Sequence, residues 1–255
     1  MKHPPRFFAL IIGTEILNRR RSDRHFDFLS RELLERGYKL SGSFIIEDDP
    51  ALIVQTLKFL STQPRSVIFS FGGIGSTPDD HTRKCAAIAL RDGTLKEHPE
   101  AREIIARRIE TMKIPDGRYP LRMALLPKGA KLLKENPVNG MPGFYLDDRY
   151  FFVPGFPEMA HPMIRWALDR YFPPREHKPL RKTLTAQTRE SALIDLMEHL
   201  PEGVDLSSLP KITEEGPRVS ISLSGDDAEK VSAAFEAFKK ALEARDIPYA
   251  EADSE

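Results

Sequence analysis

The sequence contains a single cysteine, Cys85, among 255 residues. One cysteine excludes an intrachain disulfide and is typical of proteins in a reducing compartment, so we expect a cytoplasmic protein. Histidines are also few, seven in all, and no group of histidine and cysteine has the spacing of a zinc site. Neither disulfides nor structural zinc is expected.

Neither sign of charge dominates, and long hydrophobic runs are missing. The chain carries 38 lysine and arginine residues against 38 aspartate and glutamate residues, so no overall field attracts nucleic acid or an anionic membrane. No stretch approaches the roughly 20 apolar residues that span a bilayer. The run "FFALIIG" near the N-terminus is shorter than a secretory core and precedes no small-residue cleavage site. We expect a soluble protein without nucleic-acid or membrane partners, in which any anion is bound by a local site.

Hydrophobic residues, 40% of the chain, alternate between strand and helix patterns. Residues 6–13 form a continuous apolar run ending in glycine, as expected of a strand buried in a parallel sheet. A helix at 25–36 follows, with Phe26, Leu29 and Leu33 on its apolar stripe. This alternation with short connections predicts a layered α/β fold with a mostly parallel sheet. Further strands are predicted at 40–46, 66–71 and 122–126 and a hairpin at 143–155, and further helices after Asp49, from Asp79 or Asp80 to Leu90, at 98–113 and at 157–172.

The composition changes at "PPREHKP", residues 173–179, which is rich in proline and charge. We therefore divide the chain into an α/β domain at 1–172, a linker at 173–180 and a small α+β domain at 181–255. The second domain has the order β-α-β-β-α and carries no clustered acids, glycine loop or histidine pair. We expect it to serve packing or dimerisation rather than catalysis.

The stretch "FSFGGIGSTPDDHT", residues 69–82, joins a glycine-rich turn to two adjacent acids. In open α/β sheets ligands bind beyond the carboxyl ends of strands, and Gly72, Gly73 and Gly75 would let backbone N–H groups converge on a phosphate there. Asp79 and Asp80 would oppose a bare phosphate, whereas a hard cation such as Mg²⁺ would join both halves of the loop. Spacing alone equally allows a tight turn followed by acids that cap a helix.

A resemblance to a known family adds to this. "GGIGSTPDDHT" resembles the signature Gly-Gly-x-Gly-x-Thr-x-Asp-Asp-x-Thr of the molybdopterin-binding domain, in the branch of competence/damage-inducible protein A. "GTEIL" at 13–17, "EDDPALIVQTL" at 47–57, "ALLPKGAKLLKENPVNGMPGF" at 124–144 and "VPGFPEM" at 153–159 resemble further motifs of that family, in order. The resemblance covers about residues 6–172 and implies a three-layer sandwich followed by a small α+β domain.

The same resemblance implies roles for particular residues. Asp80 would be the principal metal and catalytic carboxylate and Asp48 the second, with Mg²⁺ or another divalent cation as cofactor and molybdopterin as a candidate ligand. The partner would be a small phosphorylated ligand, and we expect a homo-oligomer, a dimer or a trimer. The ligand-binding residues implied are Gly72, Gly73, Gly75, Ser76, Thr77, Thr82, Glu15, Asp23, Pro154, Gly155 and Glu158.

Two segments depart from the family pattern. Arg19 stands where glycine is common, and Asp23-Arg24-His25 replaces Asp-Thr-Asn; Ser76 also stands where proline is usual. We favour ligand contact for Arg19 and its neighbours Arg20 and Arg21, which could grip a second phosphate, over a solvated loop. With no nearby acids, we expect this loop to be mobile without ligand. His25 is equally compatible with acid–base chemistry and with a place at a helix start.

Three functions remain open on the sequence. The first is a Mg²⁺-dependent hydrolase of a nucleotide diphosphate conjugate such as ADP-ribose or FAD. The second is a molybdopterin-binding protein without turnover, and the third an adenylyltransferase of molybdenum cofactor biosynthesis. We expect no amidase domain like that of full-length members, so the resemblance does not imply pyridine-nucleotide deamidation.

The other cysteine, histidine and tryptophan residues are not expected to take part in catalysis. Cys85 is expected to be a small packed residue rather than a nucleophile. We place His81 on the surface and Trp166 on the apolar face of the last helix of the first domain. His161 and His177 have no predicted role.

Overall fold

The computed structural model describes residues 4–214 and 216–252 and separates into two compact units, Met1–Pro174 and Arg175–Glu255. The division falls between Pro174 and Arg175, inside the segment that the sequence marks as a linker. Each unit has its own hydrophobic core. No helix among the described residues is long and apolar enough to cross a membrane.

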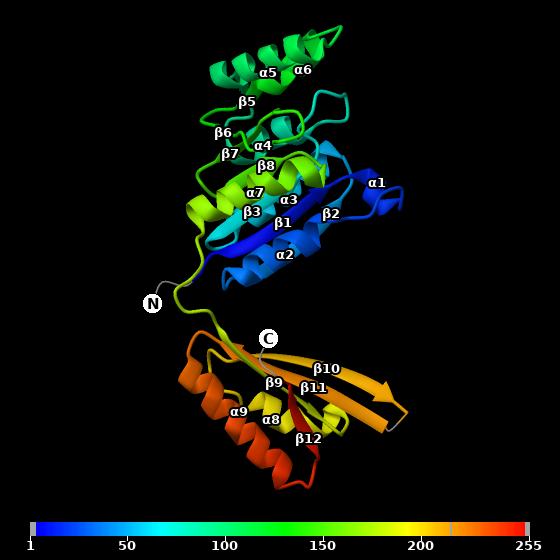
Figure 1. Ribbon diagram of the computed structural model, residues 1–255, viewed down its shortest axis with the longest axis vertical. Helices are drawn as coiled ribbons and strands as arrows, with labels where there is room; N and C mark the ends of the chain where they lie inside the picture. Colours follow the sequence, from blue (N-terminus) through cyan, green and yellow to red (C-terminus); the bar gives the residue numbers. More distant parts are fainter. Residues whose placement is uncertain (1–3, 215, 253–255) are drawn as a thin grey trace. The chain divides into compact units, whose positions relative to one another are not determined.

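The first unit is built on a six-stranded sheet with the order β2-β1-β3-β8-β7-β6 (Figure 1). Its strands β1, β2, β3 and β8 are parallel, whereas β7 runs antiparallel to β8 and β6 antiparallel to β7. The predicted mostly parallel sheet is therefore confirmed, and the predicted hairpin is the β7–β8 pair. The strands are β1 (Arg6–Ile12), β2 (Leu40–Ile46), β3 (Ser66–Phe71), β6 (Lys131–Leu133), β7 (Gly143–Leu146) and β8 (Tyr150–Val153).

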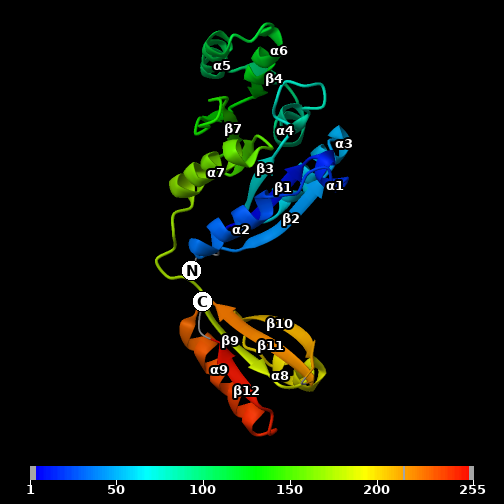
Figure 2. The ribbon, with the colours of Figure 1, turned by 45° about the vertical axis from the view of Figure 1, so that its right-hand side comes forward.

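Helices cover both faces of this sheet and complete the three-layer sandwich (Figures 1 and 2). Alternate side chains of β1 enter different cores, because successive residues of a strand point to opposite faces. Phe7 and Ile11 pack with α2 (His25–Glu35) and α7 (Pro157–Tyr171), and Phe8 and Leu10 pack with helices of the other face. Those helices are α3 (Pro50–Thr62), α4 (Thr82–Leu90) and α5 (Pro99–Met112).

Five further short elements belong to the described part of the first unit. They are α1 (Thr14–Leu17), α6 (Arg118–Leu121), the 3₁₀ helix η1 (Arg122–Ala124) and a separate two-stranded sheet of β4 (Leu95–Glu97) and β5 (Leu125–Pro127). The strand predicted at 122–126 is wrong in its first half, which is η1. The apolar residues there satisfy both patterns over so short a length.

Two further predictions for the first unit are wrong, one about where a helix begins and one about which side chains a helix buries. Helix α4 begins at Thr82, not at Asp79 or Asp80, because Asp80 closes a turn with Thr77 instead of capping the helix. On α2, Phe28 is buried with Leu29 and Leu33, whereas Phe26 is 46% exposed and lies off the predicted stripe.

The second unit is a four-stranded antiparallel sheet with the order β10-β11-β9-β12. The core on its inner face joins the sheet to the amphipathic helix α9, in which Val231, Phe235, Phe238 and Leu242 are buried. The final strand, β12, was not predicted. The elements are β9 (Leu180–Ala186), η2 (Glu190–Leu193), α8 (Ile194–Glu198), β10 (Asp205–Thr213), β11 (Gly216–Gly225), α9 (Ala228–Glu243) and β12 (Tyr249–Ala252).

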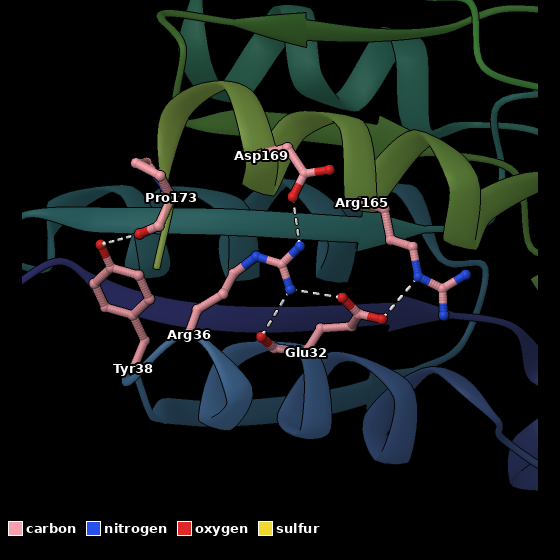
Figure 3. Close-up of polar contacts among 6 residues, drawn as sticks. All are labelled: Glu32, Arg36, Tyr38, Arg165, Asp169 and Pro173. Atoms are coloured by element: carbon pink, nitrogen blue, oxygen red, sulfur yellow. Dashed lines mark hydrogen bonds and ion pairs between the residues drawn. The ribbon is translucent and has the colours of Figure 1, made fainter. Parts of the chain in front are cut away.

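A polar network joins α2 to α7 in the first unit (Figure 3). Arg36 donates to the Glu32 carboxylate at 2.7 Å and to Asp169 at 2.6 Å, and Arg165 donates to the second oxygen of Glu32 at 2.7 Å. The side chains of Arg36 and Glu32 are only 11% and 12% exposed. In a separate contact, the Tyr38 hydroxyl, just after α2, donates to the carbonyl of Pro173, just after α7, at 3.1 Å. These contacts fix the two helices on the same face of the sheet.

We expect Arg36→Met to lower the free energy of unfolding by about 1–3 kcal/mol, because it removes a charge-assisted donor from the nearly buried Glu32. The matched control is Arg107→Met, which removes the same i,i+4 pairing from Glu103 where both side chains are more than 60% exposed. That control should cost at most about 0.5 kcal/mol. Urea unfolding followed by the fluorescence of Trp166, the only tryptophan, measures both. Equal losses in the two variants would contradict the assigned importance of burial.

Candidate functional site

The strand order changes direction at β1, so the first sheet has a topological switch point at its carboxyl edge. The chain leaves β1, passes through α2 to β2 on one side of β1, and returns through α3 to β3 on the other side. Loops that follow β1 and β3 therefore diverge at this edge, which is where open α/β sheets bind ligands. The loops after β2 and β8 leave the same edge, because all four strands are parallel.

The glycine loop after β3 is folded tightly against its neighbours. Gly72 has a φ of +99°, and a Cβ there would lie 2.3 Å from the Ile12 carbonyl oxygen. A Cβ on Gly73, whose φ is +67°, would lie 2.3 Å from the Thr82 hydroxyl. Only glycine avoids both the conformational cost and the overlap. The loop thus needs glycine at these positions for a physical reason that the sequence already suggested.

Thr82 holds this loop from beneath. Its hydroxyl donates to the Gly72 carbonyl at 2.9 Å, and its N–H donates to the Gly73 carbonyl at 2.9 Å. The Thr82 side chain has no exposed surface. In this conformation Thr82 therefore braces the cradle, and the direct ligand contact expected of it is not available because its hydroxyl is buried and bonded.

The Asp80 carboxylate lies directly over the same loop. Asp80 Oδ2 accepts a hydrogen bond from the Thr77 N–H at 2.8 Å and another from the Thr77 hydroxyl. A Cβ on Gly75 would lie 2.6 Å from Asp80 Oδ2, so the third glycine is needed for the acid to approach. Ser76 is half-buried and Thr77 exposed between them. The structure therefore brings together Gly72, Gly73, Gly75, Ser76, Thr77 and Asp80 in one compact turn.

Arg83 is a supporting residue that the sequence analysis missed. Its side chain is buried and donates to the Gly75 carbonyl at 2.6 Å, to the Leu125 carbonyl at 3.3 Å and to the Arg122 carbonyl. Burial lowers the pKa of this guanidinium, and the nearby Asp80 carboxylate raises it. Since its two terminal nitrogens, Nη1 and Nη2, donate to three carbonyls, Arg83 fixes the back of the loop. In the sequence, the only indication of this role is that an arginine lies on the apolar helix that follows Asp79 and Asp80.

Asp48 connects the loops after β2 and β1. Its Oδ2 accepts hydrogen bonds from the Thr14 N–H at 2.8 Å and from the Thr14 hydroxyl at 2.9 Å. The Asp48 N–H in turn donates to the Thr14 hydroxyl at 3.1 Å. Asp48 and Asp80 are thus held in two separate loops, on the strands that flank β1.

The remaining acids named from the sequence have partners of their own. Asp23 accepts from the N–H groups of His25 at 2.9 Å and Phe26 at 3.1 Å, so it caps the start of α2. Glu158, exposed at the start of α7, lies 3.4 Å from the Arg24 guanidinium. Pro154 and Gly155 are half-buried in the loop after β8, and Gly155 approaches Gly72, since a Cβ on Gly155 would lie 3.4 Å from the Gly72 Cα. These residues form the wall beside the cradle.

One member of the arginine cluster, Arg21, has contacts that the sequence did not predict. Arg21 Nη1 lies 3.9 Å from a Glu15 carboxylate oxygen, and the Arg21 guanidinium lies 4.7 Å from the centre of the Phe156 ring. Arg19 has a φ of +60° and, like Arg20, is exposed. The expectation that no acid lies near the cluster is wrong, because the short helix α1 brings Glu15 back beside Arg21.

Two histidines are packed behind the wall, His25, for which the sequence left two interpretations open, and His161, for which it predicted no role. His25, 3% exposed, stacks on Phe71 and donates from Nε2 to the Gly155 carbonyl at 3.2 Å, so its Nδ1 carries no proton when the ring is neutral. His161 stacks on Phe28 with ring centres 3.6 Å apart and meets the His25 ring edge-on at 5.4 Å. His25 Nδ1 and His161 Nε2 are buried without hydrogen-bond partners among the described residues. The His25 ring is therefore packed against Phe71, and its position at a helix start alone did not predict this packing.

We expect stability to fall with acid because of this pair. Burial lowers the pKa of His25, and burial with the neighbouring His25 lowers the pKa of His161 to about 4; Arg165 and Arg24 also lower it, and Glu158 opposes them. Each folded pKa is below that of the unfolded chain, so stability is complete above about pH 6.5 and is lost towards pH 4. His161→Gln should reduce the loss between pH 7 and pH 5 by about 1–2 kcal/mol.

The measurement is urea unfolding at both pH values, followed by Trp166 fluorescence. His177→Gln, which changes an exposed histidine, should leave the pH dependence as in the wild type. A His161→Gln protein with the wild-type pH dependence would contradict the packing assigned to His161.

Cys85 and Trp166 are packed against hydrophobic cores, as the sequence predicts. Cys85 is 2% exposed within the core of α3 and α4, and burial raises the pKa of its thiol to about 11. Trp166 is partly buried against the core beneath α7. His81, half-buried, is the residue that precedes α4.

These features define an α/β domain with a mostly parallel sheet and a glycine loop at the carboxyl edge of that sheet. The family described as "Probable molybdopterin binding domain" matches residues 8–173, and the chain belongs to this family. The family resemblance drawn from the sequence is thereby confirmed. The fold is also that of a crystal structure of the protein CinA from Thermoplasma acidophilum, with a TM-score of 0.56 and 24% identity over 65% of this chain and 97% of that one.

Related sequences include longer proteins. The chain is 28% identical over 236 residues to a protein of Caldivirga maquilingensis, covering 89% of this chain and 91% of that protein. It is 31% identical to a CinA-like protein of Acaryochloris marina over 61% of this chain, but over only 37% of that protein. For a Mycobacterium CinA-like protein the identity is 29%, with 79% of this chain and 46% of the relative covered. The chain thus spans less than half the length of these two CinA-like relatives.

Proposed function

We propose that the first unit binds a phosphorylated ligand together with a divalent cation at the glycine loop, and that it hydrolyses a nucleotide diphosphate such as ADP-ribose or FAD. The observation that carries the proposal is the placement of the Asp80 carboxylate against Gly75, in the loop that Gly72 and Gly73 shape. Backbone N–H groups of this loop suit phosphate oxygens, and a carboxylate in the same turn suits a cation bound to that phosphate.

The donor set fits Mg²⁺ bound together with its substrate. Among the described residues, no three His, Cys, Asp or Glu side chains gather as a complete metal cage. Mg²⁺ is usually held by one or two carboxylates with waters and substrate phosphates completing its shell. In Asp80 and Asp48 the Thr77 and Thr14 groups bond to Oδ2, so Oδ1 is the oxygen that we assign to a cation. Asp80 would be the main ligand, and Asp48 the second, from the loop after β2 on the other side of β1.

The cation would neutralise the diphosphate and lower the pKa of a bound water. The protein's own residues orient the substrate: the glycine loop holds the phosphate, and Asp80 and Asp48 position the water beside it. Water oxygen bonds to one phosphorus, the bridging P–O bond breaks, and the two products are phosphate monoesters. His25 is not assigned as the base, because it is buried and its Nε2 is bonded to the Gly155 carbonyl.

The alternative is a molybdopterin-binding protein without turnover, or adenylyl transfer in molybdenum cofactor biosynthesis. Because His25 and His161 are packed in the protein and not available at the loop, they do not serve proton transfer there, which favours binding without turnover. All these functions require the same loop, so the experiment must measure binding and turnover separately.

The deciding experiment incubates the full chain with ADP-ribose, FAD and ATP, each with Mg²⁺, Mn²⁺ or EDTA, and analyses the products by chromatography. Calorimetry of the same ligands and of molybdopterin runs beside it. Metal-dependent release of AMP supports hydrolysis, and molybdopterin binding without any product supports the alternative. Pyrophosphate release from ATP with transfer of AMP to molybdopterin would indicate adenylyl transfer, and no binding of any ligand would refute the proposal.

We also propose that the protein forms a homo-oligomer, a dimer or a trimer, through the second unit. Its edge strand β10 exposes Leu209 by 60% and Ile212 by 95%. Edge strands with exposed apolar residues are prone to pair with another chain. Sedimentation equilibrium should show association of the wild type and a shift to monomer in Leu209→Lys/Ile212→Lys. A wild type that is monomeric at high concentration would contradict this proposal.

A further inference from the structure

An exposed phenylalanine lies at the carboxyl edge of the first sheet, beside the glycine loop. Phe156 precedes α7, directly after the Pro154-Gly155 turn, and is 55% exposed. A single exposed apolar residue is ordinary on a protein surface and carries no argument by itself. Phe156 differs from such residues because the Arg21 guanidinium contacts its ring.

Arg21 lies over the Phe156 ring, with its guanidinium carbon 4.7 Å from the ring centre. This is within the range of a cation–π contact, and a planar guanidinium also stacks on aromatic faces. The Glu15 carboxylate, 3.9 Å from Arg21 Nη1, holds the guanidinium from its edge. The side chains of Arg21 and Glu15 remain 32% and 41% exposed. Arg21 is thus oriented by two partners and still accessible to a ligand.

The contact between Arg21 and Phe156 joins the loops that follow the two strands on either side of β3. Arg21 belongs to the loop after β1 and Phe156 to the loop after β8, and both strands are direct neighbours of β3. Strands two places apart in a sheet are separated by about 10 Å, so the two side chains reach toward each other across the end of β3. Gly155 approaches Gly72, which places the residue before Phe156 against the first glycine of the cradle.

We propose that Arg21 and Phe156 form a stacking platform for a planar heteroaromatic ring whose phosphate group binds at the glycine loop. The ligand class is then a nucleotide or pterin phosphate, and phosphates without a ring bind more weakly. The inference rests on the proposed function only in that the glycine loop is taken to hold the phosphate. Aromatic faces and arginine planes stack on any base, so the platform sets the ligand class without reading a base sequence.

The test compares AMP with ribose 5-phosphate, which has the same phosphate and sugar but no ring. Calorimetry with Mg²⁺ measures both ligands on the full chain and on Phe156→Leu, Phe156→Trp and Arg21→Lys. The matched control is Phe59→Leu, which changes a phenylalanine 54% exposed on α3.

Loss of one stacking contact should weaken AMP binding by about 5- to 100-fold in Phe156→Leu, and affinity for ribose 5-phosphate should stay within about twofold. Phe156→Trp keeps an aromatic face and should restore AMP binding. Arg21→Lys keeps the charge but loses the plane, so it should weaken AMP more than ribose 5-phosphate. Phe59→Leu should match the wild type for both ligands.

The outcomes separate this inference from the proposed function. If the wild type binds AMP and ribose 5-phosphate equally and Phe156→Leu changes neither, phosphate binding stands and the platform is refuted. If Phe156→Leu weakens both ligands equally, Phe156 only shapes the loop and the platform is again refuted. If the wild type binds neither ligand, both the proposed function and the platform fail.

Discussion

Asp80→Asn is expected to reduce metal-dependent turnover of a nucleotide diphosphate by about 100-fold or more, because it removes the carboxylate that holds the cation beside the substrate phosphates. The fold should survive the change. An asparagine oxygen can still accept from the Thr77 N–H, which Asp80 Oδ2 accepts at 2.8 Å, so unfolding should change by no more than about 1 kcal/mol. Full turnover in a folded Asp80→Asn protein would refute the assignment.

Asp79→Asn is the matched control, since it removes the same charge one residue away from an exposed position. Its turnover should remain close to that of the wild type. Asp48→Asn should lie between the two, because Asp48 also ties the loops after β1 and β2 together through Thr14. The measurement is initial rate against Mg²⁺ concentration for all three variants. An equal loss for Asp79→Asn and Asp80→Asn would indicate a general charge effect instead of a cation ligand.

Gly72→Ala is expected to lower the free energy of unfolding by about 3 kcal/mol or more and to abolish ligand binding at the loop. Two costs combine at this position. The φ of +99° is strained for any residue with a Cβ, and the new atom would overlap the Ile12 carbonyl oxygen, which is backbone and cannot rotate away. Relief of the overlap must separate the loop after β3 from the end of β1.

Gly129→Ala isolates the conformational cost. Gly129 has a φ of +77°, and a Cβ there would meet nothing within 4 Å, so this variant should lose only about 1 kcal/mol. Urea unfolding followed by Trp166 fluorescence compares the two variants, and calorimetry with AMP measures the cradle. If Gly72→Ala lost no more stability than Gly129→Ala, the close packing of the loop against β1 would be incorrect.

The glycine loop illustrates which features of the candidate site could be predicted from the sequence alone. The spacing of Gly72, Gly73 and Gly75 after an apolar strand predicted a loop at a ligand-binding edge, and the structure has such a loop at that edge. The helix predicted to begin at Asp79 or Asp80 begins at Thr82 instead. An aspartate near a helix start can cap that helix or close a turn, and only the position of Thr77 decides between these uses.

The sequence by itself determined the longer strands and helices and the layered α/β arrangement, because hydrophobic periodicity is local and the order of strands and helices leaves few ways to cover a parallel sheet. The tertiary structure alone decided the contacts between loops far apart in the chain. Arg83 bonds carbonyls on the η1 and β5 side, Arg21 meets Phe156, and His161 packs on Phe28 and His25. Such contacts depend on which strand ends become neighbours and on which buried polar groups find partners there, and neither is encoded in the spacing of any single segment.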